Sequence, residues 1–424
     1  MNILIVGSGG REHAFGWHLK RSPLTDKLFF APGNAGTAAI GENLSISAND
    51  FDVIRNAVLK NDIKLVIVGP EEPLVRGIVD YFKSEPSLSG IKIIGPDSKA
   101  AALEGSKDFA KQFMQKYNIP TARYLTVTPD TVAEGRIFMA SLSAPYVLKA
   151  DGLAAGKGVL IINDYDEACE ELNRILGGKF GAAGNKVVIE EFLSGIELSM
   201  FVLTDGKDYF LLPEAKDYKR VGEGDQGLNT GGMGAVSPVP FATDEFKLKV
   251  EEKIIKPTIE GIKKEGLYYK GFIFFGLIKV GDEPYVIEYN VRMGDPETEV
   301  VMPRLMNDLV ELLQATAEGK LGGLVAEHDY RTAVTIVMVS GGYPGHFEKG
   351  FEITGLDKVD GSLVFHAGTK LSGSSILTDG GRLMAVTSFG DDIVEASELS
   401  RKNASLINYD NKYYRRDIGF DLLD

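Results

Sequence analysis

The sequence predicts an α/β protein with a parallel-sheet N-terminal domain, a larger central region and an α+β C-terminal domain. Residues 1–100 alternate short apolar runs with helical patterns, which is typical of a parallel sheet wrapped by helices. The glycine-rich segment Lys149–Val159 lies between two apolar, strand-like runs, so we expect it at a hairpin. The segment Val286–Glu297 is a strand pattern that carries acids and an amide, which favours a ligand-binding strand.

The composition is typical of a soluble globular protein: of 424 residues, 44% are apolar and 25% are charged. A net charge of −14 argues against a nucleic acid or an anionic membrane as the main partner, so any phosphate site must be local. Met1 runs directly into an apolar strand pattern without the shape of a signal peptide. The single cysteine, Cys169, excludes an internal disulfide. We therefore expect a cytoplasmic enzyme whose thiol is inert.

The N-terminal elements follow from apolar runs that glycine and proline interrupt. Strands are expected at Asn2–Val6, Leu28–Ala31, Leu65–Val68 and Lys92–Ile94, and helices from the first glycine turn to Leu19, near Phe51–Leu59, and from about Leu74 to Phe82. Ligands of an open parallel sheet bind beyond the carboxyl ends of the strands. Those ends carry Gly7–Gly10, Pro32–Asn34 and Gly69–Glu72.

The rest of the chain consists of a helix, a compact unit around the glycine loop, and longer strands. Ser106 is predicted to cap a helix that runs to about Tyr117. Further strands are expected at Tyr146–Lys149, Val159–Ile162, Lys186–Ile189, Leu198–Leu203, Tyr209–Pro213, Gly271–Val280, Tyr285–Asn290, Ala333–Val339 and Leu383–Thr387, and helices near Asp244–Lys264 and Asn307–Ala317. The expected domains are 1–103, 104–325 with a lid subdomain at about 122–190, and 326–424.

The first glycine loop, Gly7–Ala14, follows a strand and opens a helix, so its N–H groups could hold a phosphate. It resembles the dinucleotide fingerprint, but Glu12 stands at the third glycine position. Pro32–Asn34 stands where an acidic residue would hold a ribose. We favour a site for a sugar phosphate or a similar small anion over NAD or FAD, or over a bare structural turn.

The second glycine loop, Asp151–Gly158, does not fit a Walker A motif. That motif needs a glycine where Asp151 stands and Ser or Thr where Gly158 stands. A Walker A loop is also followed by a helix, whereas strand patterns flank the loop of this chain on both sides. The pattern favours a mobile hairpin that folds over phosphates, and the alternative is a Gly/Ala-rich solvent loop.

Three further segments carry polar residues with two possible meanings. In Ile189–Ser199, the acids could mark a solvated edge, which is the favoured reading in isolation, or a hinge that binds a nucleotide. Glu288 and Asn290 share one face of a strand, so both oxygens can bind one cation; a half-exposed polar strand is the alternative. The long, glycine-dense segment Asp217–Pro238 is expected to be an ordered substrate loop.

These segments, in this order, resemble the ATP-grasp superfamily and, within it, the phosphoribosylamine–glycine ligase family, over essentially the whole chain. The segments that carry the resemblance are GSGGREHA, APGNAGT (Ala31–Thr37), VGPEEPLV (Val68–Val75), LEGSKDFAK (Leu103–Lys111), KADGLAAGKGV, NTGGMGA (Asn229–Ala235), NVRMGDPET and FHAGTK (Phe365–Lys370). NTGGMGA together with FHAGTK is specific to that family. The ATP-grasp parts alone would also suit biotin-dependent carboxylases, carbamoyl phosphate synthetases and D-alanine ligases. The sequence departs from the family at Tyr218, Leu228, Val291 and Met293, where His, Pro, Cys and Phe are frequent.

The resemblance implies central ATP-grasp domains with a small mobile lid, and a set of ligand contacts. The implied ATP contacts are Lys107, Lys149, Gly152, Gly156, Lys157 and Gly158 at the phosphates, Glu190, Glu191 and Leu193 at the adenine, and Glu197 at the ribose. Glu288 and Asn290 would bind magnesium or manganese, with Asp295 and Glu297 as candidates for further ligands. The implied substrate contacts are Gly7, Gly9, Gly10, Asn34, Glu71, Lys219, Arg220, Arg292 and Asp295. Arg292 and Lys149 would be catalytic.

The resemblance also implies the reaction: ATP-dependent ligation of glycine to 5-phospho-β-D-ribosylamine through a glycyl phosphate. The implied partners are these small molecules, with no nucleic acid and no membrane, and the expected state is a monomer. Three rivals stay open. They are a carboxylate–amine ligase with another acid or amine, an NAD-dependent oxidoreductase built on Gly7–Gly10, and a silent nucleotide-binding module. Glu12 argues against the second, and retention of Lys149, Glu288 and Asn290 against the third.

Overall fold

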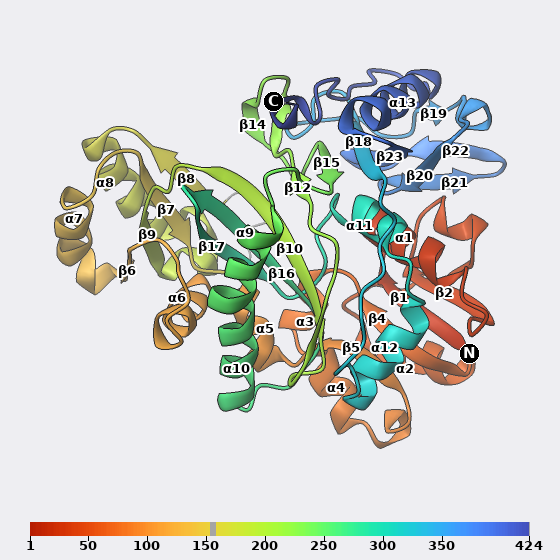
Figure 1. Ribbon diagram of the computed structural model, residues 1–424, viewed down its shortest axis with the longest axis horizontal. Helices are drawn as coiled ribbons and strands as arrows, with labels where there is room; N and C mark the ends of the chain where they lie inside the picture. Colours follow the sequence, from red (N-terminus) through yellow and green to blue (C-terminus); the bar gives the residue numbers. More distant parts are fainter. Residues whose placement is uncertain (153–157, 424) are drawn as a thin grey trace.

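The computed structural model describes residues 1–152 and 158–423 (Figure 1). A central sheet has the strand order β11-β10-β16-β5-β4-β1-β2-β3, and β17 pairs with β16. Its strands are β1 (Asn2–Gly7), β2 (Lys27–Pro32), β3 (Glu42–Asn43), β4 (Ile63–Val68), β5 (Lys92–Pro96), β10 (Ile196–Thr204), β11 (Tyr209–Leu211), β16 (Tyr269–Val280) and β17 (Glu283–Asn290). The sheet therefore joins the N-terminal region to the central region.

The N-terminal half of this sheet is parallel, as predicted: β2, β1, β4 and β5 follow one another with parallel register. Alternate residues of β1 pack into two different apolar clusters, with Leu4 and Val6 in one and Ile3 and Ile5 in the other. Both faces of the strand are thus covered, which explains why its sequence is apolar throughout rather than alternating.

The helices lie around the sheets, and those at residues 10–19, 51–60, 107–116, 244–250, 256–264 and 309–318 are where the sequence places helices, whereas those at 98–105, 298–304 and 393–406 were not predicted. They are α1 (Gly10–Leu19), α2 (Phe51–Lys60), α3 (Glu71–Val75), α4 (Ile78–Ser84), α5 (Ser98–Gly105), α6 (Lys107–Lys116), α7 (Val132–Ala140), α8 (Tyr165–Arg174), α9 (Asp244–Val250), α10 (Lys256–Lys264), α11 (Thr298–Arg304), α12 (Leu309–Glu318) and α13 (Ile393–Leu406). The single helix expected from Leu74 to Phe82 is wrong. Gly77 adopts a φ of 87°, and this left-handed residue separates α3 from α4. None of the helices described is long and apolar enough to cross a membrane.

The antiparallel half of the central sheet meets the parallel half at β16 and β5. Tyr269 pairs with Pro96 and Lys270 with Gly95. A Cβ added at Gly271 would lie 3.0 Å from the Cα of Gly95, so glycine allows the two strands to approach this closely. The continuous sheet fixes the polar end of β17 relative to the N-terminal loops.

A separate four-stranded sheet carries the second glycine loop and projects to one side of the molecule (Figure 1). Its order is β6-β9-β7-β8, with β6 (Tyr124–Val127), β7 (Tyr146–Ala150), β8 (Val159–Ile162) and β9 (Val187–Glu191). It has its own apolar core beneath α7 and α8. Because strand β8, not a helix, follows the loop, the predicted departure from a Walker A motif is confirmed. Gly156 and Lys157 lie outside the described residues.

The C-terminal region forms a sheet with the order β12-β15-β18-β23-β20, covered by α13. Its strands are β12 (Lys216–Asp217), β15 (Gly234–Ser237), β18 (Thr332–Val339), β20 (Ser362–His366) and β23 (Arg382–Gly390), and a small sheet beside it contains β19 (Glu352–Ile353), β21 (Thr369–Ser372) and β22 (Ser375–Thr378). Two of these strands come from the glycine-dense segment Asp217–Pro238 and its approach. Between them, β13 (Arg220–Gly222) and β14 (Gln226–Asn229) form a hairpin that the sequence pattern did not predict.

Candidate active site

Two lysines from different elements approach the second glycine loop. Lys107 is the first residue of α6, directly after Ser106, whose hydroxyl accepts the N–H of Phe109 as the predicted N-cap. The Lys107 ammonium donates to the carbonyl of Gly152 at 3.3 Å. Lys149, at the end of β7, donates to the carbonyl of Ile287 at 3.3 Å. Both ammonium groups therefore stand at the edge of the loop, close to β17.

A buried ion cluster surrounds Glu190 on β9. Its carboxylate lies 2.9 Å from the ammonium groups of both Lys149 and Lys111. Burial would raise the pKa of Glu190, but the two lysines hold it below its ordinary value. Burial lowers the pKa of Lys111 to about 8. Because Glu190 is only 3% exposed, a solvated edge is the wrong reading for this residue. Lys111 was not predicted, although it lies one helical turn from Lys107.

The segment after β9 leads along the edge of this cluster. The N–H of Glu191 donates to the carbonyl of Arg123 at 3.0 Å, and its carboxylate accepts the N–H of Arg123 at 2.8 Å. Leu193 lies in the irregular connection that follows. Glu197, on β10, is paired with Lys219. Along the chain from Glu190 to Glu197, the buried ion cluster is thus followed by main-chain hydrogen bonds and then by a second ion pair.

The polar end of β17 carries Glu288 and Asn290. A bulge in the pairing with β16 leaves Ile287 as the extra residue, which aims its carbonyl at Lys149. Beyond the bulge, Glu288 and Asn290 share a face, and Asn290 is 7% exposed. Their carboxylate and amide oxygens suit a hard divalent cation.

The charges around this strand fit a bound cation. Burial and then Glu197 raise the pKa of Asp217, and burial and then Asp217 raise that of Glu297 to about 7. The Lys219 ammonium offsets part of the repulsion among these carboxylates, and a bound cation would offset more of it. Within the described residues no group of three or more His, Cys, Asp or Glu side chains could hold a metal. Phosphate and water oxygens usually complete the ligand shell of Mg²⁺.

Arg292 is held by two carboxylates of the N-terminal region. Its Nη2 donates to Oε1 of Glu104 at 2.8 Å, and its Nε lies 3.4 Å from Oε2 of Glu71. The other oxygen of Glu104 accepts the N–H of Val291 at 2.8 Å. Glu104 thus orients the Arg292 guanidinium. Sequence patterns missed Glu104, because its partners lie 187 and 188 residues away.

Two carboxylates, those of Glu12 and Asp295, lie close to Gly9 in the first glycine loop. The N–H of Gly9 donates to Oε2 of Glu12, which satisfies a donor at the start of α1. A Cβ at Gly9 would lie 2.8 Å from that oxygen and 3.0 Å from Oδ2 of Asp295. Because the Glu12 and Asp295 carboxylates approach Gly9 this closely, they argue against a dinucleotide pyrophosphate on the loop. Asn34 uses its side chain within the protein: the amide donates to the carbonyls of Ser8 and His366.

The C-terminal region supplies residues that the sequence patterns did not identify. Arg382, at the start of β23, lies 3.0 Å from Oδ1 of Asp295 and donates to the Asp295 carbonyl at 2.7 Å. It also donates to the carbonyl of Gly231, whose N–H donates to the Tyr343 hydroxyl at 3.0 Å. The C-terminal sheet therefore closes the side of the site that the first loop faces. An isolated arginine ahead of a strand gives no local signal of this role.

The fold and the site together define an ATP-grasp ligase: a glycine hairpin, two lysines and the polar end of β17 meet where the four-stranded sheet adjoins the central sheet. Residues 1–104, 105–298 and 333–421 match the family models of the N domain, the ATP-grasp (A) domain and the C domain of phosphoribosylglycinamide synthetase. The chain belongs to this family.

Individual relatives agree with this assignment. The phosphoribosylamine–glycine ligase of Haemophilus influenzae is 46% identical over 426 residues, covering 99% of this chain and 98% of that protein. The one from Caldanaerobacter subterraneus is 44% identical over 419 residues, 99% of each. The crystal structure of phosphoribosylamine–glycine ligase from Thermotoga maritima has a TM-score of 0.85 at 37% identity, covering 98% and 100% of the two chains. Biotin carboxylase from Campylobacter jejuni shares the fold alone, with 14% identity and a TM-score of 0.73 over 99% and 94% of the chains.

Proposed function

We propose that this chain joins glycine to 5-phospho-β-D-ribosylamine in two steps, through a glycyl phosphate. The overall activity, ATP-dependent phosphoribosylamine–glycine ligation in purine biosynthesis, is that of relatives matched along 99% of the chain. The observation that carries the proposal is the meeting of Lys107, Lys149 and the Glu288–Asn290 face beside the glycine hairpin.

In the first step, the γ-phosphoryl group of ATP moves to the glycine carboxylate. A carboxylate oxygen is a poor leaving group, and phosphorylation converts it into a good one. Lys107 and Lys149 neutralise the phosphates, with Gly152, Gly156, Lys157 and Gly158 covering them. Arg292 faces the glycine carboxylate or the transferred group, because its planar fork suits oxyanions. A cation held by Glu288 and Asn290, either Mg²⁺ or Mn²⁺, would supply further charge neutralisation.

In the second step, the amine of phosphoribosylamine attacks the acyl carbon, and phosphate leaves. The lid sheet and its hairpin must exclude water, which would otherwise hydrolyse the acyl phosphate. Glu190 and the main chain of Glu191 and Leu193 take the adenine, and Glu197 takes the ribose. The proposed contacts of the amino acid and ribosylamine are Gly7, Gly9, Gly10, Asn34, Glu71, Lys219, Arg220, Arg292 and Asp295. Asn34 acts here by holding the loop, because its side chain is already engaged.

The proposed organisation keeps domains at 1–103, 104–325 with a lid at about 122–190, and 326–424. We propose a cytoplasmic monomer that acts on small molecules. We also propose that it binds neither nucleic acid nor membrane, because a net charge of −14 disfavours contact with either polyanion.

Release of ADP with each substrate omitted in turn tests the function. We expect turnover only when ATP, glycine and phosphoribosylamine are all present. Sustained turnover with another acid or amine, and none with this pair, would identify a different carboxylate–amine ligase. A nicotinamide fluorescence titration checks the oxidoreductase rival, for which we expect no binding because Glu12 occupies the loop.

A further inference from the structure

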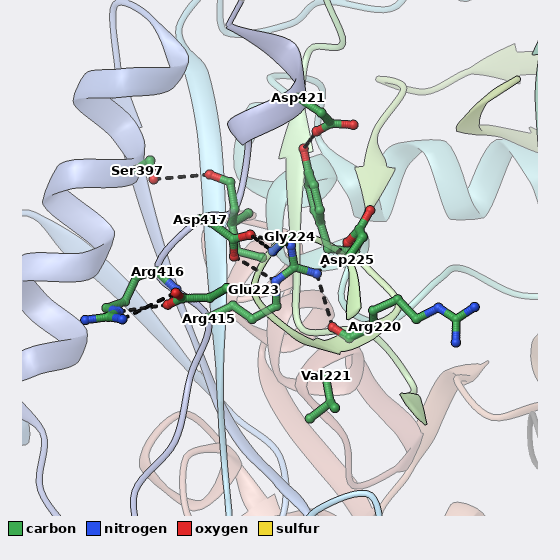
Figure 2. A network of polar contacts seen from close by, with 12 residues as sticks. Arg220, Val221, Glu223, Gly224, Asp225, Ser397, Arg415, Arg416, Asp417 and Asp421 are labelled. Carbon is green, nitrogen blue, oxygen red and sulfur yellow. Dashed lines mark hydrogen bonds and ion pairs between the residues drawn. The ribbon is translucent and has the colours of Figure 1, made fainter. Parts of the chain in front are cut away.

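The C-terminal segment holds the β13–β14 hairpin through one buried arginine. The side chain of Arg415 is 0% exposed, and its guanidinium lies at the centre of the network in Figure 2. It donates to Oδ1 of Asp225 at 2.6 Å, to Oδ1 of Asp417 at 2.8 Å and to the carbonyl of Arg220 at 3.1 Å. Asp417 in turn accepts the N–H of Gly224. The Arg415 guanidinium thus connects the first strand and the turn of the hairpin to the C-terminal segment of the chain.

A second contact holds the chain just before the hairpin. The Tyr218 hydroxyl donates to Oδ1 of Asp421 at 2.6 Å, and the Lys216 ammonium lies 3.0 Å from Oδ2 of the same residue. The Lys216 ammonium also stands 3.8 Å from the centre of the Tyr218 ring. The first of these bonds depends on the hydroxyl group of Tyr218.

Lys219 lies in the sequence between the two anchored residues, Tyr218 and Arg220. Its ammonium pairs with Glu197 on β10. Burial would lower its pKa, but the charges of Asp217, Glu197 and Glu288 raise it well above its ordinary value. Its carbonyl accepts the N–H of Thr230 at 2.8 Å, which closes the base of the hairpin. The direction of Lys219 therefore depends on main chain that the tail holds at Tyr218 and Arg220.

We propose that Arg415 is a positioning residue for nucleotide binding, which holds the Lys219 ammonium against Glu197. Because Glu197 is the proposed ribose contact, the position of the Lys219 ammonium affects the nucleotide directly. This assigns the C-terminal tail a part in the site although it contributes no side chain to the ATP. The inference rests on the proposed function for the role of Glu197.

The test compares Arg415→Met and Arg415→Lys with Arg416→Met. Arg416 is the matched control, because it follows Arg415 and forms an ion pair with Glu223 but is 71% exposed. We expect Arg415→Met to raise KM for ATP at least tenfold with a smaller change in kcat. Arg415→Lys should recover part of the loss, and Arg416→Met should stay within twofold of the natural chain. Equal effects of Arg415→Met and Arg416→Met on KM would overturn the proposal.

A double-mutant cycle separates positioning from general stabilisation. In a Lys219→Met background, Arg415→Met should change KM for ATP less than twofold, because the group it positions is gone. The same tenfold change in both backgrounds would show that Arg415 does not act through Lys219. If Arg415→Met does not fold, Asp225→Asn replaces it. Asp225 has a φ of 53°, which asparagine tolerates, so this variant removes the charge without straining the turn.

Calorimetric titration with MgADP keeps this test independent of the ligase assignment. A weaker Kd for MgADP in Arg415→Met, with Arg416→Met unchanged, supports the positioning role whichever acid and amine the enzyme joins. Loss of turnover with glycine and phosphoribosylamine in the natural chain, by contrast, would affect only the proposed function. Unchanged MgADP binding in Arg415→Met would reject the positioning role.

Discussion

The imidazole of His13 accepts a hydrogen bond from the backbone N–H of His366, with 2.8 Å between the nitrogen atoms, although 353 positions separate the two residues. This bond requires an unprotonated Nδ1 on His13. Burial, and then the charge of His366, lower the pKa of His13 to about 3, and burial lowers that of His366 to about 4. The pair joins α1 to the end of β20 in its neutral form, beside Asn34.

Acid should therefore weaken the fold through these histidines. Each has a folded-state pKa below the unfolded value of about 6.5, so the unfolded state binds more protons between those values. Their contribution to stability is complete above pH 6.5 and is lost as the pH falls toward 4. In His13→Asn, the amide oxygen can still accept the N–H of His366 but does not titrate. We expect similar stability at pH 7 and a shallower decline between pH 6.5 and 5, measured by urea unfolding. Identical slopes would refute the assignment.

Removal of the Glu288 carboxylate should nearly abolish turnover and leave the fold intact. Loss of one such charge contact typically raises the barrier by about 2–4 kcal/mol. Glu283→Ala is the control, because Glu283 lies on the same strand but its side chain is 45% exposed and pairs with Lys253. Steady-state ADP release at saturating magnesium measures both variants. If Glu288→Ala turned over at nearly the rate of the natural chain, Glu288 would not be a metal ligand.

Hydroxylamine should trap the proposed intermediate. With ATP and glycine present, we expect glycine hydroxamate to form, because hydroxylamine attacks an acyl phosphate as the ribosylamine nitrogen does. Glu288→Ala serves as the blank. Mass spectrometry detects the product. Formation of ADP under these conditions without any hydroxamate would count against a glycyl phosphate.

Lys111, a buried lysine that pairs with Glu190, should increase the affinity of the site for nucleotide. Lys111→Met removes one positive charge from the cluster that holds Glu190, so the pocket becomes less favourable for a polyanion. We expect KM for ATP to rise about tenfold, or about 1.4 kcal/mol. Lys116→Met is the control: Lys116 lies on the same helix, is 64% exposed and pairs with Glu265. Equal KM values for the two variants would contradict this role.

Local chemistry explains which parts were predictable. The apolar runs of β1 and β4, the cap at Ser106 and the strand after the glycine loop depend on neighbouring residues, and all are found as expected. The break at Gly77 was missed because a single glycine in a helical pattern is usually tolerated. The β13–β14 hairpin was missed because its strands are short, polar and held by a distant tail.

The order of the motifs, with the segments NTGGMGA and FHAGTK, indicates the family and the reaction class from the sequence alone, because each motif is a contiguous stretch of the chain. Tertiary structure alone decides which charges meet. Glu104 orients Arg292, Lys111 flanks Glu190, Arg382 holds Asp295, and Arg415 anchors the hairpin beneath Lys219. A buried charge needs a partner wherever the fold brings one, and no local pattern reveals a partner that is distant in the sequence.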